Sequence, residues 1–334
     1  MTSPLPMAIA MDWGGTWTRA SVIDRNGEVQ WSSRVANPKN AGKDGLLENA
    51  DGLLNEAIAA CGDSPIAGIG VAVAGPVDAD TGTLYDPPNL PELDGVSLKE
   101  RWEPMTGHPV WVGNDANLAA LGEYHFGAGL AARLEGDGPS TLVYMTISTG
   151  IGGGVVDRGR MYLGAKGVAA EIGHMSMDMS ATAPKCQCGS SGCLEALASG
   201  TAIARIARSA SSGIGYQDSL LATGERESIT SESVFQAAAQ GDRLALSILD
   251  DVVQALGTGL TNVLHLYNPD LVVLGGGVTV GLGQLKFLPR IEAIMRDRAM
   301  SQRHKEFLLV ASSLGDGVGM AGAAAIVWEA VGLH

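Results

Sequence analysis

The sequence has no run of about 18 uninterrupted apolar residues, the length that a membrane-spanning helix needs, although 46% of its residues are hydrophobic. Segment 1–6 also lacks the basic and apolar regions of a signal peptide. We therefore expect a cytoplasmic protein that has no membrane partner.

Basic residues are in the minority, with 22 Lys and Arg against 36 Asp and Glu, which gives a formal net charge of −14. General affinity for nucleic acid needs a basic face, so no nucleic-acid partner is expected. The same field would repel a long polyanionic substrate. A small phosphate ligand stays compatible with this charge, because a local nest of backbone N–H groups can hold one.

Cysteine is scarce, with four residues in the chain. A disulfide scaffold would spread its cysteines more evenly along a short secreted chain. Three of the four, Cys186, Cys188 and Cys193, lie close together, which in a cytosolic protein indicates metal ligands. Cys61 stands alone, and we expect it to be a small buried hydrophobic residue.

A histidine completes the candidate metal site. His174 ends the segment Glu171-Ile172-Gly173-His174, and three thiols with one imidazole suit tetrahedral Zn²⁺. Because protein groups would fill all four positions and three thiolates outweigh the charge of the ion, it would be a poor Lewis acid. We therefore predict a structural zinc.

The chain is long enough for about two domains, and it contains an internal duplication. An apolar strand, a glycine turn and a returning strand occur twice, at 7–11, 12–16 and 18–24, and again at 141–147, 148–154 and 155–157. This repetition predicts two similar α/β lobes, each with a phosphate-binding turn.

Hydrophobic periodicity places the remaining elements. Helices are predicted at 46–61, 116–126, 231–240, 244–267 and from a cap at Asp316 to about 331, and strands at 28–35, 66–74, 110–112 and 271–274.

The first glycine turn has a chemical rationale. Gly14 and Gly15 would let the backbone approach a phosphate, Thr16 can donate a hydroxyl, and Asp12 can hold a hydrated Mg²⁺. The alternative is an ordinary β-hairpin whose glycines serve only the backbone.

The second turn alternates hydroxyl residues and glycines directly after a strand, including Thr149 and Gly150. It is not a Walker loop, because no Gly-Lys-Ser/Thr follows, and it runs into a strand rather than the helix of a dinucleotide fingerprint. A glycine-rich hairpin is the alternative, but two such turns together favour phosphate sites. A third glycine run, 275–277, would let adenine approach a strand end or be a bare turn.

These segments resemble the ROK family of sugar kinases and related repressors, and within it the bacterial glucokinases. The resemblance covers nearly the whole chain and is carried by the turns at 12–16 and 149–154, by 114–117, by 171–174 and by the cysteine segment through Glu195. It implies an actin-like ATPase fold with two RNase H-like lobes around a central cleft. Residues 1–118 plus 317–334 would form the smaller lobe, and 119–316 the larger lobe with the zinc site.

The resemblance also assigns site residues. It implies sugar contacts from Gly75, Asn89, Asn114, Asp115, Glu171, His174 and Glu195. It implies phosphate contacts from Gly14, Gly15, Thr16, Thr149 and Gly150, with Asp12 near Mg²⁺, Gly276 beside the nucleotide, and zinc held by His174, Cys186, Cys188 and Cys193. Ser148 stands where the family usually has glycine, a departure that bears on the shape of the turn.

Asp115 is the predicted catalytic base, because a sugar hydroxyl is almost un-ionised at neutral pH and needs a carboxylate to accept its proton. The alternative is that Asp115 caps the helix at 116–126. Zinc would hold Glu171 and Glu195 in place, and His174 could bind it through one nitrogen while the other N–H meets the sugar. The alternatives are solvated charges for the glutamates and a turn role for Asn89.

The predicted function is ATP-dependent phosphorylation of a hexose at its 6-hydroxyl, with glucose as the first candidate. The cofactors would be ATP, Mg²⁺ and structural Zn²⁺. An N-acetylhexosamine kinase is the alternative within this class. A sugar-responsive repressor is the alternative from another class, although only 11 residues precede Asp12, too few for a helix-turn-helix. The resemblance suggests a homodimer or homotetramer.

Overall fold

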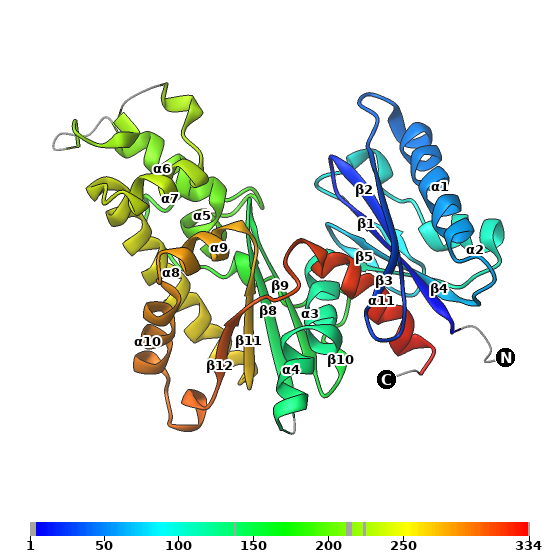
Figure 1. The fold of residues 1–334 in the computed structure, drawn as a ribbon. Helices are drawn as coiled ribbons and strands as arrows, with labels where there is room; N and C mark the ends of the chain where they lie inside the picture. The colour runs from blue at the N-terminus through cyan, green and yellow to red at the C-terminus, as the bar shows by residue number, and fades with distance from the viewer. Residues whose placement is uncertain (1–4, 137, 212–215, 223–224, 333–334) are drawn as a thin grey trace. The chain divides into compact units, whose positions relative to one another are not determined.

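A computed structural model describes residues 5–136, 138–211, 216–222 and 225–332 (Figure 1). Over these residues the Cα positions divide the chain into two compact units. The first unit consists of Met1–Gly138, Gly154–Ala170 and Ser313–His334, and the second of Pro139–Gly153 and Glu171–Ser312. Both units mix strands and helices, as the sequence predicted.

A mixed sheet with the strand order β3-β2-β1-β4-β7 forms the centre of the first unit. β2 is antiparallel to both β1 and β3, whereas β4 runs parallel to β1 and to β7. The strands of this sheet are β1 (Met7–Trp13), β2 (Trp17–Ile23), β3 (Val29–Ala36), β4 (Ile66–Val73) and β7 (Val110–Asn114). Short β5 (Val77–Asp78) and β6 (Thr83–Leu84) pair with each other, and β10 (Arg160–Met161) belongs to the second sheet. The helices are α1 (Gly42–Ala60), α2 (Leu98–Thr106), α3 (Asp115–Phe126), α4 (Ala128–Glu135) and α11 (Val318–Ala330), with 3₁₀ turns η1 (Pro91–Leu93) and η6 (Gly315–Gly317).

The two faces of this sheet differ because large and small residues alternate along β1 and β4, and successive side chains of a strand point to opposite faces. Large residues at odd positions, such as Ile9 and Ile69, share a hydrophobic core with Leu53 of α1. At an even position, a Cβ on Gly70 would collide with the carbonyl oxygen of Ala323 in α11. Thus α1 covers the face of large residues, and α11 lies close against the face of small ones.

A second sheet has the strand order β10-β9-β8-β11-β12. β8 (Thr141–Ile147) is followed by β9 (Ile151–Asp157), and β11 (Leu271–Gly275) runs parallel to β8 and to β12 (Leu308–Ala311). The same order of a hairpin followed by two parallel strands therefore occurs in both sheets. This confirms the predicted duplication.

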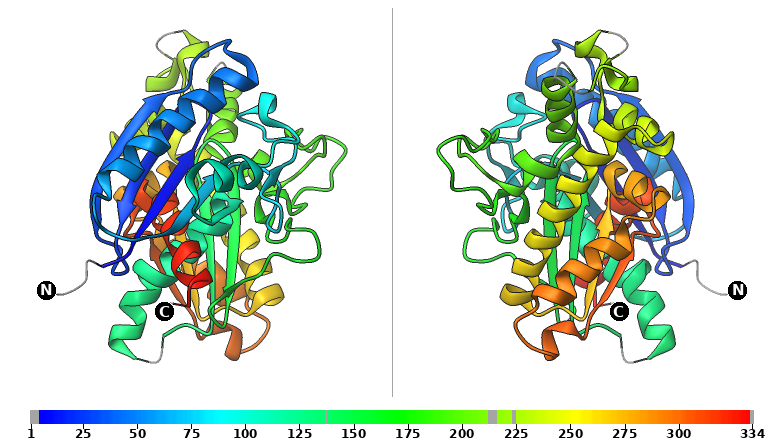
Figure 2. Two further views of the ribbon diagram at one scale, coloured as in Figure 1. Left: turned by 90° about the vertical axis from the view of Figure 1, so that its right-hand side faces the viewer. Right: turned by 90° about the vertical axis from the view of Figure 1, so that its left-hand side faces the viewer.

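Helices make up most of the rest of the second unit. They are α5 (Leu194–Ala198), α6 (Gly200–Ala210), α7 (Ser231–Ala239), α8 (Arg243–Tyr267), α9 (Gly277–Gln284) and α10 (Leu288–Arg298), with 3₁₀ turns η2 (Ile172–His174), η3 (Leu220–Ala222), η4 (Arg226–Ser228) and η5 (Arg303–Lys305). The long helix α8 packs beside α10 (Figure 2).

By length and composition α8 could cross a membrane, and among the described residues no other helix meets that test. However, 61% of its most apolar window is buried. Leu249, Leu256 and Leu260 are fully enclosed, so α8 is a core helix of the second unit.

The structure corrects two predicted boundaries. The second glycine turn ends at Gly150 rather than at residue 154, because β9 already begins at Ile151. Gly154 therefore lies within a strand, where a Cβ would come 2.5 Å from the carbonyl oxygen of Ala116 in α3. The last helix, α11, is not capped by Asp316, which lies in η6. The N-cap of α11 is Gly317, and no side chain caps this helix.

Candidate functional site

The first glycine turn joins β1 to β2, and hydrogen bonds with neighbouring protein groups hold its backbone. Gly14 N–H donates to the Trp17 carbonyl at 3.0 Å, and Asn37 Nδ2 donates to the Gly14 carbonyl at 2.7 Å. Gly15 and Thr16 are exposed. The turn therefore keeps its outer donors available to a ligand. Asn37 was missed by the sequence analysis because no local motif connects it to this turn.

Asp12 lies at the end of β1, half-buried, with its carboxylate 3.6 Å from Arg19 Nε. Burial raises the pKa of the Asp12 carboxyl, and the charge of Arg19 opposes that rise. Arg19, which no sequence motif singled out, pairs directly across from Asp12 in the β1–β2 hairpin. The register of the hairpin was the signal that could have identified this pair.

Two predicted sugar contacts in the first unit lie against other predicted site residues. Asn89 is exposed and packs on the first turn, since a Cβ at Gly15 would come 3.0 Å from Asn89 Cβ. The carbonyl of Gly75 accepts a hydrogen bond of 3.2 Å from Asn114 Nδ2. The first unit thus brings Asn89 to the first glycine turn and Gly75 to Asn114.

Asn114, and not Asp115, is the N-cap of α3. Its backbone is extended, and its Oδ1 accepts hydrogen bonds from Ala116 N at 3.0 Å and Asn117 N at 3.1 Å. Asp115 is the first residue of the helix, half-buried, with Oδ1 2.8 Å from Ala116 N. The helix-cap alternative for Asp115 is therefore wrong by one residue, and the helix dipole favours a carboxylate at this position.

The second turn, 148–150, belongs to the second unit. Ser148 N–H donates to the Gly150 carbonyl at 2.9 Å, and the Ser148 carbonyl accepts from Gly200 N at 2.7 Å. The Thr149 carbonyl accepts from Thr201 N at 3.3 Å. Since Ser148 and Thr149 are exposed, the start of α6 holds the inner side of this turn while its outer side faces solvent.

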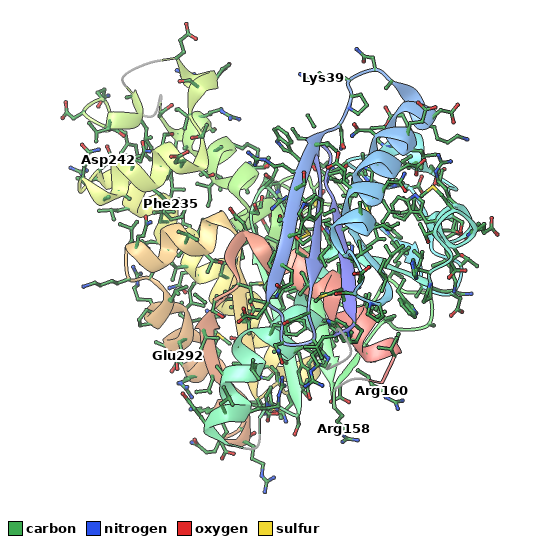
Figure 3. The ribbon with its side chains drawn as sticks, turned by 45° about the vertical axis from the view of Figure 1, so that its right-hand side comes forward. Lys39, Arg158, Arg160, Phe235, Asp242 and Glu292 are labelled. Carbon is green, nitrogen blue, oxygen red and sulfur yellow. The ribbon has the colours of Figure 1, made fainter. Side chains whose placement is uncertain are left out.

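One cavity begins at this turn, and a second adjoins the first. One of about 320 Å³ is lined by Ser148, Thr149, Gly200, Thr201, Ala204, Arg208, Thr230, Ser231, Gly277 and Val278. The other, of about 530 Å³, shares Ser231, Gly277 and Val278 with it. Its walls come from α7 and α9 and include Phe235, which Figure 3 labels. A polar cavity at a hydroxyl-rich turn, continued by a larger one with an aromatic wall, suits a phosphate-bearing ligand with a planar base.

The predicted nucleotide residue Gly276 is the N-cap of α9, immediately before the shared wall of these cavities. Thr201, Ser231 and Phe235 were missed by the sequence analysis. They come from α6 and α7, which carry no glycine motif, and only the tertiary structure brings them to the turn.

The predicted metal ligands lie together. One donor atom from each of His174, Cys186, Cys188 and Cys193 lies within 4.8 Å of the others. Cys186 Sγ is 3.7 Å from His174 Nδ1, and the Sγ atoms of Cys188 and Cys193 are 3.7 Å apart. Burial raises the pKa of the Cys186 thiol, whereas a backbone hydrogen bond from Ser190 lowers that of Cys188. Three sulfurs and one imidazole nitrogen in this compact set fit a tetrahedral ion such as Zn²⁺.

The two glutamates beside this Cys₃His cluster have different surroundings. Glu171 is exposed, with Oε2 3.9 Å from His174 Nε2. Glu195, on α5, has Oε1 3.5 Å from Cys186 Sγ, and its Oε2 accepts a hydrogen bond of 2.9 Å from Ile151 N at the end of the second turn. The sequence analysis did not predict that Glu195 contacts this turn.

Comparison with known proteins agrees with these features. Residues 8–330 match the model of the ROK family. The glucokinase of Thermotoga maritima is 35% identical over 327 residues, which cover 97% of this chain and 98% of that protein. The xylose repressor of Caldicellulosiruptor bescii is 27% identical, and the match covers 96% of this chain but 77% of the repressor.

Among solved structures, a ROK family glucokinase from Streptomyces griseus in complex with glucose and AMPPNP is similar, with 32% identity and a TM-score of 0.74. The match covers 96% of this chain and 98% of that one, and it confirms the predicted actin-like ATPase fold. Because family match, sequence identity and fold all extend over nearly the whole sequence, this chain belongs to the ROK family.

Proposed function

We propose that this chain transfers the γ-phosphoryl group of ATP to the 6-hydroxyl of glucose. The observation that carries the proposal is the position of Asp115, a half-buried carboxylate at the first turn of α3 directly after the Asn114 cap. The similar proteins named glucokinase, and the glucokinase solved with glucose and AMPPNP, support the choice of substrates.

Asp115 would act as the general base. A sugar hydroxyl attacks phosphorus poorly while it keeps its proton, so a positioned carboxylate accepts that proton as the new O–P bond forms and the bond to ADP breaks. The Asn114 cap holds the backbone on which Asp115 is mounted. Asn114, Gly75 and Asn89 would bind the sugar from the first unit.

The nucleotide would lie along the second unit. Thr149 and Gly150 would contact its phosphates, Gly276 would approach it from the start of α9, and Phe235 would contact the adenine in the larger cavity. Gly14, Gly15 and Thr16 would add donors from the first turn. Asp12 would hold a hydrated Mg²⁺, which offsets the charge that develops on the transferred group.

The Cys₃His cluster would hold a structural zinc. With four protein ligands the ion has no open position, so its contribution is to hold the segments that carry Glu171 and Glu195. His174 Nδ1 faces Cys186 and Nε2 faces Glu171, an arrangement that leaves one nitrogen for zinc and the other side of the ring for the sugar. The proposal also includes the predicted lobes, a cytoplasmic location and a homodimer or homotetramer.

A coupled assay of ADP release with MgATP tests this proposal across glucose, N-acetylglucosamine, N-acetylmannosamine, fructose and allose. We expect the highest kcat/KM with glucose. A preference for an N-acetylhexosamine would replace glucose by the alternative substrate. Absence of turnover with every hexose, together with specific binding of promoter DNA, would favour a repressor such as the similar xylose repressor.

The variant Asp115→Asn tests the base. Asparagine keeps the size of the side chain and an oxygen for the Ala116 N–H, so the fold is retained, but the amide cannot accept the proton. We expect kcat to fall by about 10²- to 10⁴-fold while glucose binding survives. Asp44→Asn is the matched control, since Asp44 also lies in the first turn of a helix, α1, and is not a predicted site residue. Retained turnover in Asp115→Asn would remove Asp115 from this role.

A further inference from the structure

The second turn is bonded to the segment that follows the last cysteine of the metal cluster. Glu195, two residues after Cys193, accepts a hydrogen bond of 2.9 Å from Ile151 N. The same segment continues into α6, whose first backbone N–H groups bond to the turn at Ser148 and Thr149. The second turn, which lines the proposed phosphate cavity, is thus held by a segment that begins immediately after the predicted metal ligand Cys193.

Side-chain packing brings Glu195 still closer to the turn. A Cβ on Gly150 would come 2.5 Å from Glu195 Oε2, so a larger residue there would displace the carboxylate from its present position. On another side, a Cβ on Gly173, next to the metal ligand His174, would collide with the Ile151 carbonyl oxygen. Both metal-binding segments therefore contact the end of the turn at Ile151.

Glu195 joins the two features in a single side chain. Its Oε2 accepts from Ile151 N, and its Oε1 lies 3.5 Å from Cys186 Sγ, so one carboxylate reaches from a predicted metal ligand to the turn. A thiolate that holds an ion has no proton to donate to Oε1. What would tie Glu195 to the ion is therefore its place two residues after Cys193. An ion that holds Cys186 and Cys193 would restrict where this carboxylate can lie. Each carboxylate oxygen has a second lone pair, so these bonds leave Glu195 able to accept from a sugar hydroxyl as well.

We infer that the Cys₃His cluster positions the second turn through Glu195, so that the metal supports binding of the nucleotide as well as of the sugar. The inference rests on the proposed function, because it assumes that the second turn binds phosphates. Glu195 is a positioning residue in this role: it acts on the nucleotide through the backbone of Ile151.

Titration of the metal-loaded protein with ADP in the absence of sugar, followed by calorimetry, separates this role from a sugar contact. We expect Glu195→Ala to weaken ADP affinity about tenfold, equivalent to about 1.4 kcal/mol, which is at the upper end of the range for a typical hydrogen bond. Glu195→Gln should bind ADP nearly as the wild type does, because its amide oxygen can accept the Ile151 N–H, yet its KM for glucose should rise.

Glu171→Ala is the matched control. Glu171 also flanks the metal cluster and is a predicted sugar contact, but it has no hydrogen bond to the turn among the described residues. We expect its ADP affinity to equal that of the wild type. ADP affinity that is unchanged in Glu195→Ala, or lowered equally in Glu171→Ala, would overturn the inference.

Metal depletion by a chelator that is then removed by dialysis gives a second test. ADP affinity of the wild type should fall about tenfold, and that of Glu195→Ala should fall little further, because both changes act through one carboxylate. Equal further losses in both proteins would overturn the inference. If the depleted protein unfolds by circular dichroism, the Glu195 variants in the loaded protein decide alone. Normal glucose turnover with an unchanged ADP affinity would refute only this inference, whereas a wild type that binds no nucleotide would refute the proposed function too.

Discussion

Replacing Asn114 by alanine should destabilise the first unit because this side chain makes three hydrogen bonds. Its Oδ1 accepts from Ala116 N and Asn117 N at the start of α3, and its Nδ2 donates to the Gly75 carbonyl. Loss of an N-cap costs about 0.5–2 kcal/mol, and loss of the partner of a half-buried carbonyl about 1 kcal/mol more. We expect the free energy of unfolding to fall by about 1.5–3 kcal/mol in Asn114→Ala.

Thermal unfolding followed by circular dichroism measures this loss. In a domain of this size, 1 kcal/mol corresponds to about 2–4 °C in Tm, so Asn114→Ala should lower Tm by roughly 3–12 °C. Aspartate caps a helix as well as asparagine but cannot donate to the Gly75 carbonyl. Asn114→Asp should therefore recover the larger part of the loss. A fall in Tm below about 1 °C in Asn114→Ala would refute the assignment of this side chain as the cap of α3.

Two further predictions concern stability away from the phosphate turns. The buried Asp242 carboxylate caps α8 and accepts from Ala245 N at 2.9 Å; burial raises its pKa, but its hydrogen bonds outweigh that effect and lower it. The stability that this carboxylate contributes should be complete above about pH 5 and be lost as pH falls through its folded pKa, which lies below the usual value of about 3.9. The difference in unfolding free energy between wild type and Asp242→Ala should therefore shrink below about pH 4. A constant difference from pH 7 to pH 3 would contradict this. Gly154→Val should cost about 3 kcal/mol in chemical denaturation, because its Cβ would meet the Ala116 carbonyl of α3; Gly52→Ala, on the open face of α1, should instead stabilise by about 0.5–1 kcal/mol. Equal stabilities for these two glycine variants would refute the packing argument.

Features that depend on residues close in sequence were predicted well. The two strand–turn–strand units are visible because apolar runs and glycines alternate locally, and both are present. The three cysteines of the cluster are close together in sequence, and His174 comes from a separate segment. All four donor atoms lie together, as predicted. The family resemblance added the fold, which the comparisons confirm.

The exact residues at which α3 and β9 begin depend on backbone conformation, which the sequence did not show. Asn114 is extended and Asp115 helical, which makes the first the cap and the second the first residue of α3. Composition could not distinguish them, because both asparagine and aspartate are good caps. In the same way β9 begins at Ile151, so Gly154 lies within the strand and close to the Ala116 carbonyl of α3.

The sequence by itself determined the local chemistry of this protein: two glycine turns with hydroxyl residues, a carboxylate at the start of a helix, and three thiols with one imidazole. Only the tertiary structure decided what supports each of these. Asn37 holds the first turn, Thr201 and Phe235 line the cavities at the second, and Glu195 connects that turn to Cys186. These contacts join residues from separate elements, and their distances follow from how helices pack on the sheets rather than from any spacing along the chain.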